Sequence, residues 1–152
     1  ATNNSIDVLV IKYDAQGNQI WVEEYHTFGV DKGKCIATDK LNNIYVAGFT
    51  ESANDEENTL LLKYNSNGIL LWKKEFDLSN KEDLVNDMVI DENANIYLTG
   101  SGRVNTGYTN MLTLKYDSAG TLLWSATYDG VVSGWDDARK IALGINGDVF
   151  IT

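Results

Sequence analysis

Three matched copies of one pattern run through this sequence and constrain its fold more than any other feature. The dipeptide Lys-Tyr begins at Lys12, Lys63 and Lys115, so the copies are 51 and 52 residues apart (12 to 63 and 63 to 115). Each Lys is followed nine residues later by a Trp, and then by an aromatic residue, an Asp and an aromatic-centred apolar segment. These matched positions are Trp21, Trp72 and Trp124; Tyr25, Phe76 and Tyr128; Asp31, Asp83 and Asp136; and residues 44–48, 96–100 and 149–152. A fixed period of this length indicates a repeat architecture.

The middle copy shows that each unit consists of short strands joined by tight turns. The apolar run Leu60–Tyr64 leads into a turn, and Ile69–Phe76 returns as the second strand of a hairpin. A second hairpin is predicted from Asp87–Ile90 and Ile96–Thr99, and no segment has the 3.6-residue period of a helix. Four strands in about 50 residues are typical of a β-propeller blade. We therefore expect an all-β fold, a β-propeller of four-stranded antiparallel blades with three blade-equivalents per chain.

The repeat pattern resembles that of the seven-bladed β-propeller (SBBP) repeat family of bacterial secreted and surface proteins. The resemblance rests on residues 62–68, 71–72 and 89–100 and on Asp83, with the same positions matched in the other two copies. It implies a propeller scaffold and an extracellular or cell-surface location. It implies no particular activity, because such a family is defined by its scaffold residues.

Two positions of the third copy depart from this pattern. Gly144 stands where the other copies have Asp39 and Asp91, and the copy stops at Thr152, before the Gly that ends the matching segment. The repeat units cover about residues 7–56, 57–108 and 109–152, and we expect a single repeat region over residues 1–152.

The family's strand order, a to d from the axis outward, predicts a closure problem. The chain would start with a c–d hairpin (Asp7–Tyr25) and end with an a–b pair (Arg139–Thr152), which are complementary halves of one blade. Known propellers use about 4–8 blades, so three cannot close, and Val149–Ile151 would be an unpaired edge. We expect two copies to associate head to tail through their terminal strands, as a six-bladed homodimer. The alternative is that the chain is a fragment of a longer propeller protein, which the absence of an initiator Met also allows.

Composition narrows the class of partner. The formal net charge of −10 argues against nucleic acid and against anionic membrane surfaces, both of which select clustered Lys and Arg. No apolar run is long enough to span a bilayer, and the first residues lack the features of a signal peptide. The single Cys35 excludes an internal disulfide, and we expect it to be a small buried side chain.

Most residues that suggest chemistry have a structural interpretation. The repeated Asp is expected to bond backbone amides at the entry to strand a, although a ring of cation-binding carboxylates is the alternative. The repeated Trp is expected to pack between blades, and Asp91–Asn95 to be a hairpin turn, since it lacks the Gly and Glu of a calcium loop. His26, the only histidine, has no partner for metal binding or catalysis in the sequence. We therefore expect no metal site, no cofactor and no catalytic residue.

Candidate ligand-binding residues are those at which the copies differ. Gly130–Trp135 lengthens the approach to the last inner strand and adds a Trp outside the repeated set, and an exposed Trp is a common recognition anchor. Arg139 and Lys140 replace Asn86 and Asp87 on a strand expected to line the channel. The b–c loops also differ: residues 51–57 are acidic, whereas residues 101–110 have no acidic residue and carry Arg103 and Tyr108. Neutral drift of the loops is the alternative explanation.

These observations favour a non-catalytic scaffold or binding module with a protein or glycan ligand. The alternative is an enzyme, such as a glycan hydrolase or lyase, with its site at the mouth of the axial channel. Such a site would need an acid and a base that converge in space, which a repeat alignment does not reveal.

Overall fold

The computed structural model of the chain describes residues 6–53, 56–79, 81–104, 107–131 and 134–152. Its strands are β1 (Val8–Tyr13), β2 (Gln19–Tyr25), β3 (Asp31–Thr38), β4 (Ile44–Glu51), β5 (Glu57–Tyr64), β6 (Leu70–Phe76), β7 (Asp83–Ile90), β8 (Ile96–Arg103), β9 (Thr109–Tyr116), β10 (Leu122–Tyr128), β11 (Ile141–Leu143) and β12 (Val149–Ile151). Within these ranges there is no helix with the length and hydrophobicity needed to span a membrane.

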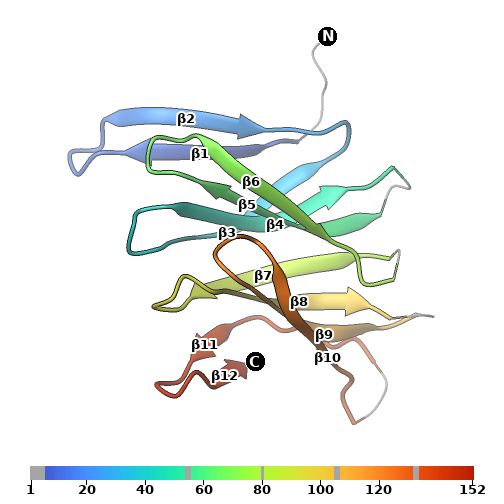
Figure 1. Ribbon diagram of the computed structural model, residues 1–152. Helices are drawn as coiled ribbons and strands as arrows, with labels where there is room; N and C mark the ends of the chain where they lie inside the picture. Colours follow the sequence, from blue (N-terminus) through green and yellow to red (C-terminus); the bar gives the residue numbers. More distant parts are fainter. Residues whose placement is uncertain (1–5, 54–55, 80, 105–106, 132–133) are drawn as a thin grey trace.

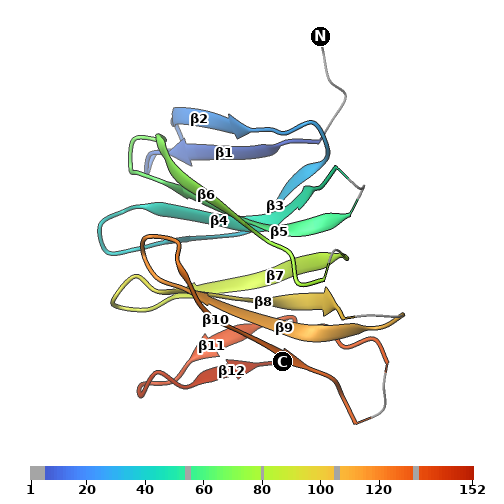
Figure 2. The same cartoon turned by 45° about the vertical axis from the view of Figure 1, so that its right-hand side comes forward.

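The strands form four antiparallel sheets that follow one another in chain order. Two sheets are four-stranded, β3-β4-β5-β6 and β7-β8-β9-β10, and two are single hairpins, β1-β2 and β11-β12. Figures 1 and 2 show these sheets stacked, with the β1-β2 hairpin at one end and β11-β12 at the other. The predicted all-β fold with four-stranded antiparallel blades is confirmed, and the two full sheets lie between two hairpins.

The sheets lie closest together at their first strands. Strand β3 packs on β7, and β7 packs on β11. In the described part of the chain, the fourth strands β6 and β10 do not pack on each other in this way. First strands that touch and fourth strands that diverge give a wedge-shaped stack, as in propeller blades around an axis. In the strand order a to d, β3, β7 and β11 are therefore the a strands.

Apolar side chains fill the two spaces between successive sheets. One cluster joins the β3–β6 sheet to the β7–β10 sheet and includes Tyr45, Leu61 and Leu98. The other joins the β1-β2 hairpin to the β3–β6 sheet and includes Val10 and Leu62. Because both faces of a full sheet meet another sheet, strands such as β4 and β8 are buried along nearly their whole length.

Five of the hairpin turns share one hydrogen-bond pattern around an Asp or Asn. In the turn after β7, Oδ1 of Asp91 accepts from the backbone N–H of Asn93 and Asn95, at 2.9 Å each. The residue three positions after the Asp or Asn has a positive φ: it is Gly17, Asn42, Gly68, Ala94 or Gly120. The same pair of bonds is made by Asp14, Asp39, Asn65 and Asp117. The prediction of hairpin turns rather than calcium loops is thereby confirmed.

The Gly that ends the repeated aromatic segment is required by a close approach of two backbones. A β-carbon at Gly48 would lie 1.8 Å from the carbonyl oxygen of Lys32, and one at Gly100 would lie 2.0 Å from that of Leu84. Both sites face a β-bulge in the neighbouring a strand, where the pairing register shifts.

Several predicted boundaries were wrong, among them the start of the third strand of the first full sheet, which is Glu57 rather than Leu60. The a strand of the second sheet begins at Asp83 rather than Asp87, because a bulge at Val85–Asp87 lets pairing with β8 continue beyond the apolar run. Residues 101–103 and 109–110, predicted as loop, extend β8 and β9 as paired strand. Residues 54–55, 105–106 and 132–133 of the three variable segments lie outside the described residues, as do residues 1–5.

Candidate functional site

The repeated Asp is part of the backbone scaffold. Oδ2 of Asp31 accepts from the backbone N–H of Thr27 at 2.6 Å, and Oδ2 of Asp136 accepts from that of Gly130 at 2.7 Å. Asp83 accepts from Leu78 at 2.5 Å, and burial raises the pKa of its carboxyl to about 6. Each carboxyl holds the loop that enters an a strand, as the structural interpretation predicted.

Three of the five candidate ligand-binding residues lie together. Tyr108, next to the start of β9, and Trp135, just before the last a strand, have ring centroids 6.1 Å apart and planes at 89°. The guanidinium of Arg103, at the end of β8, lies 5.5 Å from the centroid of the Trp135 ring. Tyr108 and Trp135 are both exposed, and Trp135 retains 65% of its accessible surface. Edge-to-face aromatic contact and a cation over the ring hold the exposed indole in place.

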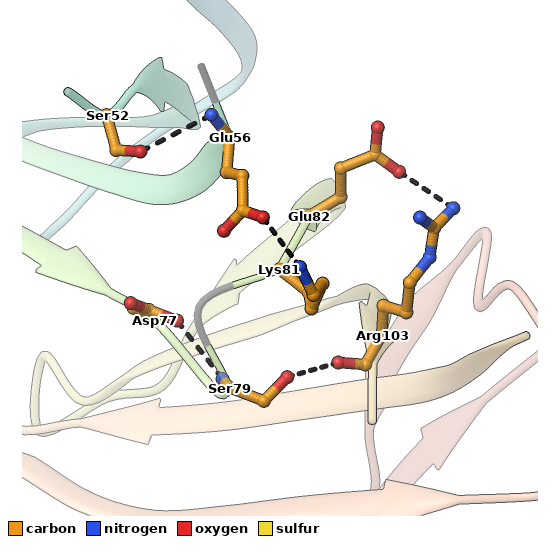
Figure 3. A network of polar contacts seen from close by, with 7 residues as sticks. All are labelled: Ser52, Glu56, Asp77, Ser79, Lys81, Glu82 and Arg103. Atoms are coloured by element: carbon orange, nitrogen blue, oxygen red, sulfur yellow. Dashed lines mark hydrogen bonds and ion pairs between the residues drawn. The ribbon is translucent and has the colours of Figure 1, made fainter. Parts of the chain in front are cut away.

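Residues of the connection between β6 and β7 also hold Arg103 (Figure 3). The Arg103 guanidinium pairs with Glu82 at 3.1 Å, and the Arg103 carbonyl accepts a short hydrogen bond from the Ser79 hydroxyl. Lys81 pairs with Glu56 at 2.8 Å, which ties the β6–β7 connection to the loop before β5. The contacts of Ser79 and Glu82 with Arg103 were not predicted from the sequence, because neither residue stands at a position that is conserved among the three copies.

Arg139 and Lys140 do not join this cluster. They precede β11, where Nε of Arg139 pairs with Asp137 at 2.7 Å and Nζ of Lys140 pairs with Asp87 of β7 at 3.5 Å. The backbone N–H groups of both residues bond the carbonyl of Thr152. Both side chains are largely exposed on the line of a strands, so they belong to the axial side and not to the aromatic surface.

The remaining candidate residues show no catalytic arrangement among the described residues. His26 is exposed. Cys35 lies within β3 and is half-buried rather than buried; its thiol contacts the Ala47 carbonyl at 3.8 Å, and burial raises the pKa of the thiol to about 12. No group of three or more His, Cys, Asp or Glu side chains suited to a metal ion is found in the part of the chain that the structure describes.

The packing prediction for the repeated Trp is right for two copies and wrong for the third. Trp21 and Trp72 are half-buried beside the apolar clusters, whereas Trp124 is exposed. The reason is that Trp21 and Trp72 each face the third and fourth strands of a following sheet, and the last sheet has only β11 and β12 among the described residues. The same open end exposes Phe150 at 60%, although its repeat equivalents Tyr45 and Tyr97 are buried at 0% and 3%.

At the opposite end of the stack, a groove lined by both apolar and polar residues follows the free edge of β1. Two adjacent depressions of about 460 and 490 Å³ are lined by β1 and β3, and Ile36 lines both of them. Ile36 is exposed, whereas its equivalents Met88 and Ile141 are buried beneath neighbouring sheets.

Comparison with known proteins agrees with this architecture. No family model matches the chain. An uncharacterised WD repeat-containing protein of Acanthamoeba polyphaga mimivirus is 25% identical over 158 aligned positions, which cover 78% of the chain and 11% of that protein. The chain carries a β-propeller-type repeat. The chain spans about a tenth of the length of the curated relative that it matches. Within this β-propeller-type chain there are two four-stranded sheets and two hairpins.

Proposed function

We propose that this chain is a non-catalytic β-propeller binding module, whose ligand surface is the cluster of Arg103, Tyr108 and Trp135. The observation that carries the proposal is an exposed indole held edge-on to a second exposed ring and capped by a guanidinium. Aromatic rings fixed in this way offer rigid apolar area at little entropic cost, with polar groups at the margin. The ligand is a protein or a glycan, since both present apolar patches beside hydrogen-bonding groups.

Arrays of glycans and of peptides, probed with the labelled chain, test this proposal. The chain is expected to bind members of one array, and Trp135→Ala is expected to lower the signal at least tenfold. Phe28→Ala is the matched control, because Phe28 is a fully exposed aromatic residue in the β2–β3 connection and lies outside the cluster. Unchanged binding by Trp135→Ala, or no binding to either array, would overturn the assignment of the surface.

The proposal includes membership of the SBBP repeat family and, with it, an extracellular or cell-surface location. WD repeats have a period of about 40–45 residues and a recurring Trp-Asp. This chain has periods of 51 and 52 residues (12 to 63 and 63 to 115), and Trp-Asp occurs once, at Trp135-Asp136. These features support the SBBP pattern, and fractionation of cells that express the native gene tests the location.

The proposal also includes a six-bladed ring made from two copies. Strand β12 of one copy pairs with β1 of the other, and Phe150 enters the partner's groove over Ile36. Exposed apolar side chains at both ends of the stack support this arrangement, because their repeat equivalents are buried. Light scattering should give twice the mass of one chain; a stable monomer would instead favour a longer polypeptide that supplies the missing strands itself.

A further inference from the structure

One lysine contact recurs between successive sheets. Nζ of Lys12 in β1 donates to the carbonyl of Ser66, in the β5–β6 turn, at 2.9 Å. Nζ of Lys63 in β5 donates to the carbonyl of Ser118, in the β9–β10 turn, at 2.8 Å. In both cases a Lys in the third strand of one sheet reaches the outer turn of the following sheet. The carbonyl that it contacts belongs to the residue three positions after the Lys of the Lys-Tyr pair in that following sheet.

A tryptophan accompanies each lysine and covers the glycine of the same turn. A β-carbon at Gly68 would lie 3.1 Å from the Trp21 ring, and one at Gly120 would lie 3.3 Å from the Trp72 ring. The indole N–H of Trp21 also donates to the carbonyl of Ser66 at 3.3 Å. The repeated Lys and Trp therefore form one turn-binding site on each sheet, and the repeated Gly makes room for the indole.

The third such site is formed but has no turn in it. Nζ of Lys115 lies 4.7 Å from the Tyr97 ring centroid, as Nζ of Lys63 lies 5.0 Å from that of Tyr45. The rings of Tyr97 and Trp124 are 6.3 Å apart at 66°, against 6.0 Å and 64° for Tyr45 and Trp72. Within the described ranges Nζ of Lys115 has no carbonyl acceptor.

One outer turn of this chain is likewise unoccupied. Ala15 stands three residues after Lys12, as Ser66 and Ser118 stand after Lys63 and Lys115. No atom lies within 4 Å of the β-carbon position at Gly17, whereas Gly68 and Gly120 are covered.

The strand that carries this turn has an open apolar face. Leu9, Ile11 and Tyr13 of β1 are 58%, 38% and 55% exposed, although the six equivalent side chains of β5 and β9 are at most 4% exposed. Those equivalents are Leu60, Leu62, Tyr64, Leu112, Leu114 and Tyr116. In both full sheets this face is covered by the preceding sheet, the one that supplies the Lys and the Trp.

We infer that Lys115 and Trp124 bind the 14–17 turn of a second copy of this chain. Nζ of Lys115 donates to the Ala15 carbonyl, and the Trp124 indole covers Gly17, while the exposed face of β1 packs on the last full sheet. This contact rests on the proposed assembly of copies and adds to it a specific recognition site, distinct from the pairing of β12 with β1. It sets the head-to-tail direction, because a chain presents the lysine site at one end of its stack and the free turn at the other.

Sedimentation velocity of the full chain over a range of concentrations tests this inference. Lys115→Met, Trp124→Ala and Gly17→Asn are each expected to weaken association at least tenfold. Asn tolerates a positive φ, so Gly17→Asn blocks the indole without breaking the turn. Gly147→Asn is the matched control, since Gly147 has a φ of 83° against 86° for Gly17 and equally open surroundings.

The outcomes separate the two ideas. A wild-type chain that stays monomeric at all concentrations overturns both the assembly and the turn contact. A dimer whose dissociation constant is unchanged in all three variants overturns the turn contact and leaves the assembly standing. Association that is weakened by Gly17→Asn but not by Gly147→Asn supports the contact, and this also holds if copies form open chains.

Discussion

The indole of Trp135 and the phenol of Tyr108 meet at a right angle, and the guanidinium of Arg103 caps the indole. The positive charge of the Arg103 guanidinium should attract iodide toward the Trp135 ring. We expect Arg103→Met to lower iodide quenching of the Trp135 fluorescence by roughly a factor of two at low salt, with acrylamide quenching unchanged. The Trp135 contribution is obtained by difference from Trp135→Phe. Equal loss with both quenchers would instead mean that the ring becomes covered.

Gly48 and Gly33 face each other in neighbouring strands but differ in the space around them. Gly48→Ala places a β-carbon on the Lys32 carbonyl, so we expect a loss of about 3 kcal/mol or more in the free energy of unfolding. Gly33→Ala meets only two valine methyl groups at 3.3 Å, and we expect a loss of at most about 1 kcal/mol. Urea denaturation measures both. Similar losses would contradict the close approach at the bulge.

Ala94 and Gly120 occupy the same position in two turns that share one hydrogen-bond pattern, and both have a positive φ. Ala94→Gly should stabilise the protein by about 0.5–1 kcal/mol, since it removes the strain of a left-handed alanine. Gly120→Ala should destabilise it by about 1–2 kcal/mol, because the new methyl group also meets the Trp72 ring. Thermal unfolding of the pair measures the two opposite signs, and a shift in the same direction would be inconsistent with a shared turn geometry.

Asp83 makes stability depend on pH between about 4 and 7. Burial raises the pKa of its carboxyl from 3.8 to about 6, so the folded state binds a proton that the unfolded state has released. This contribution is fully present below pH 3.8 and is lost as pH rises through about 6. We expect about 1–2 kcal/mol more stability near pH 4.5 than near pH 7 from this group.

Asp83→Asn isolates this effect, because the amide oxygen can still accept from Leu78 and carries no charge. In the wild-type chain the urea midpoint should rise as pH is lowered from 7 to 4.5, and in Asp83→Asn most of this rise should be absent. Turn carboxyls such as Asp39 and Asp91 act in the opposite sense: burial raises their pKa values, but several hydrogen bonds together outweigh it and hold the pKa values low, so their stabilisation is lost as pH falls below 3.8. An unchanged pH profile in Asp83→Asn would assign the dependence to other groups.

The strands and turns were predictable because each depends on residues close together in sequence or repeated in register, whereas the two half-blades were expected from the strand order that the family resemblance implies. The positive φ at the turns follows from Gly17, Gly68 and Gly120, and the apolar runs mark the paired strands. The bulge beside Gly48 was not predictable, since an inserted residue in one strand leaves the apolar pattern of both strands unchanged.

The candidate surface was predictable only in part. Sequence differences point to Arg103, Tyr108 and Trp135 one by one, but only the fold brings them together, since Trp135 is 27 positions from Tyr108 (108 to 135). Arg139 and Lys140 were selected by the same criterion and lie elsewhere. The contact of Lys63 with the Ser118 carbonyl was not predicted, although the lysine recurs in all three copies, because its acceptor lies 55 positions away in the chain.

Counted from its Lys-Tyr hairpin, each repeat unit supplies the third and fourth strands of one sheet and the first and second of the next. No single unit can therefore bury its own strands, and every junction along the array is of the same kind. Gaining or losing one whole unit would change the number of sheets by one without creating a new type of boundary. Such a chain can vary in length by duplication while each surviving contact keeps its chemistry.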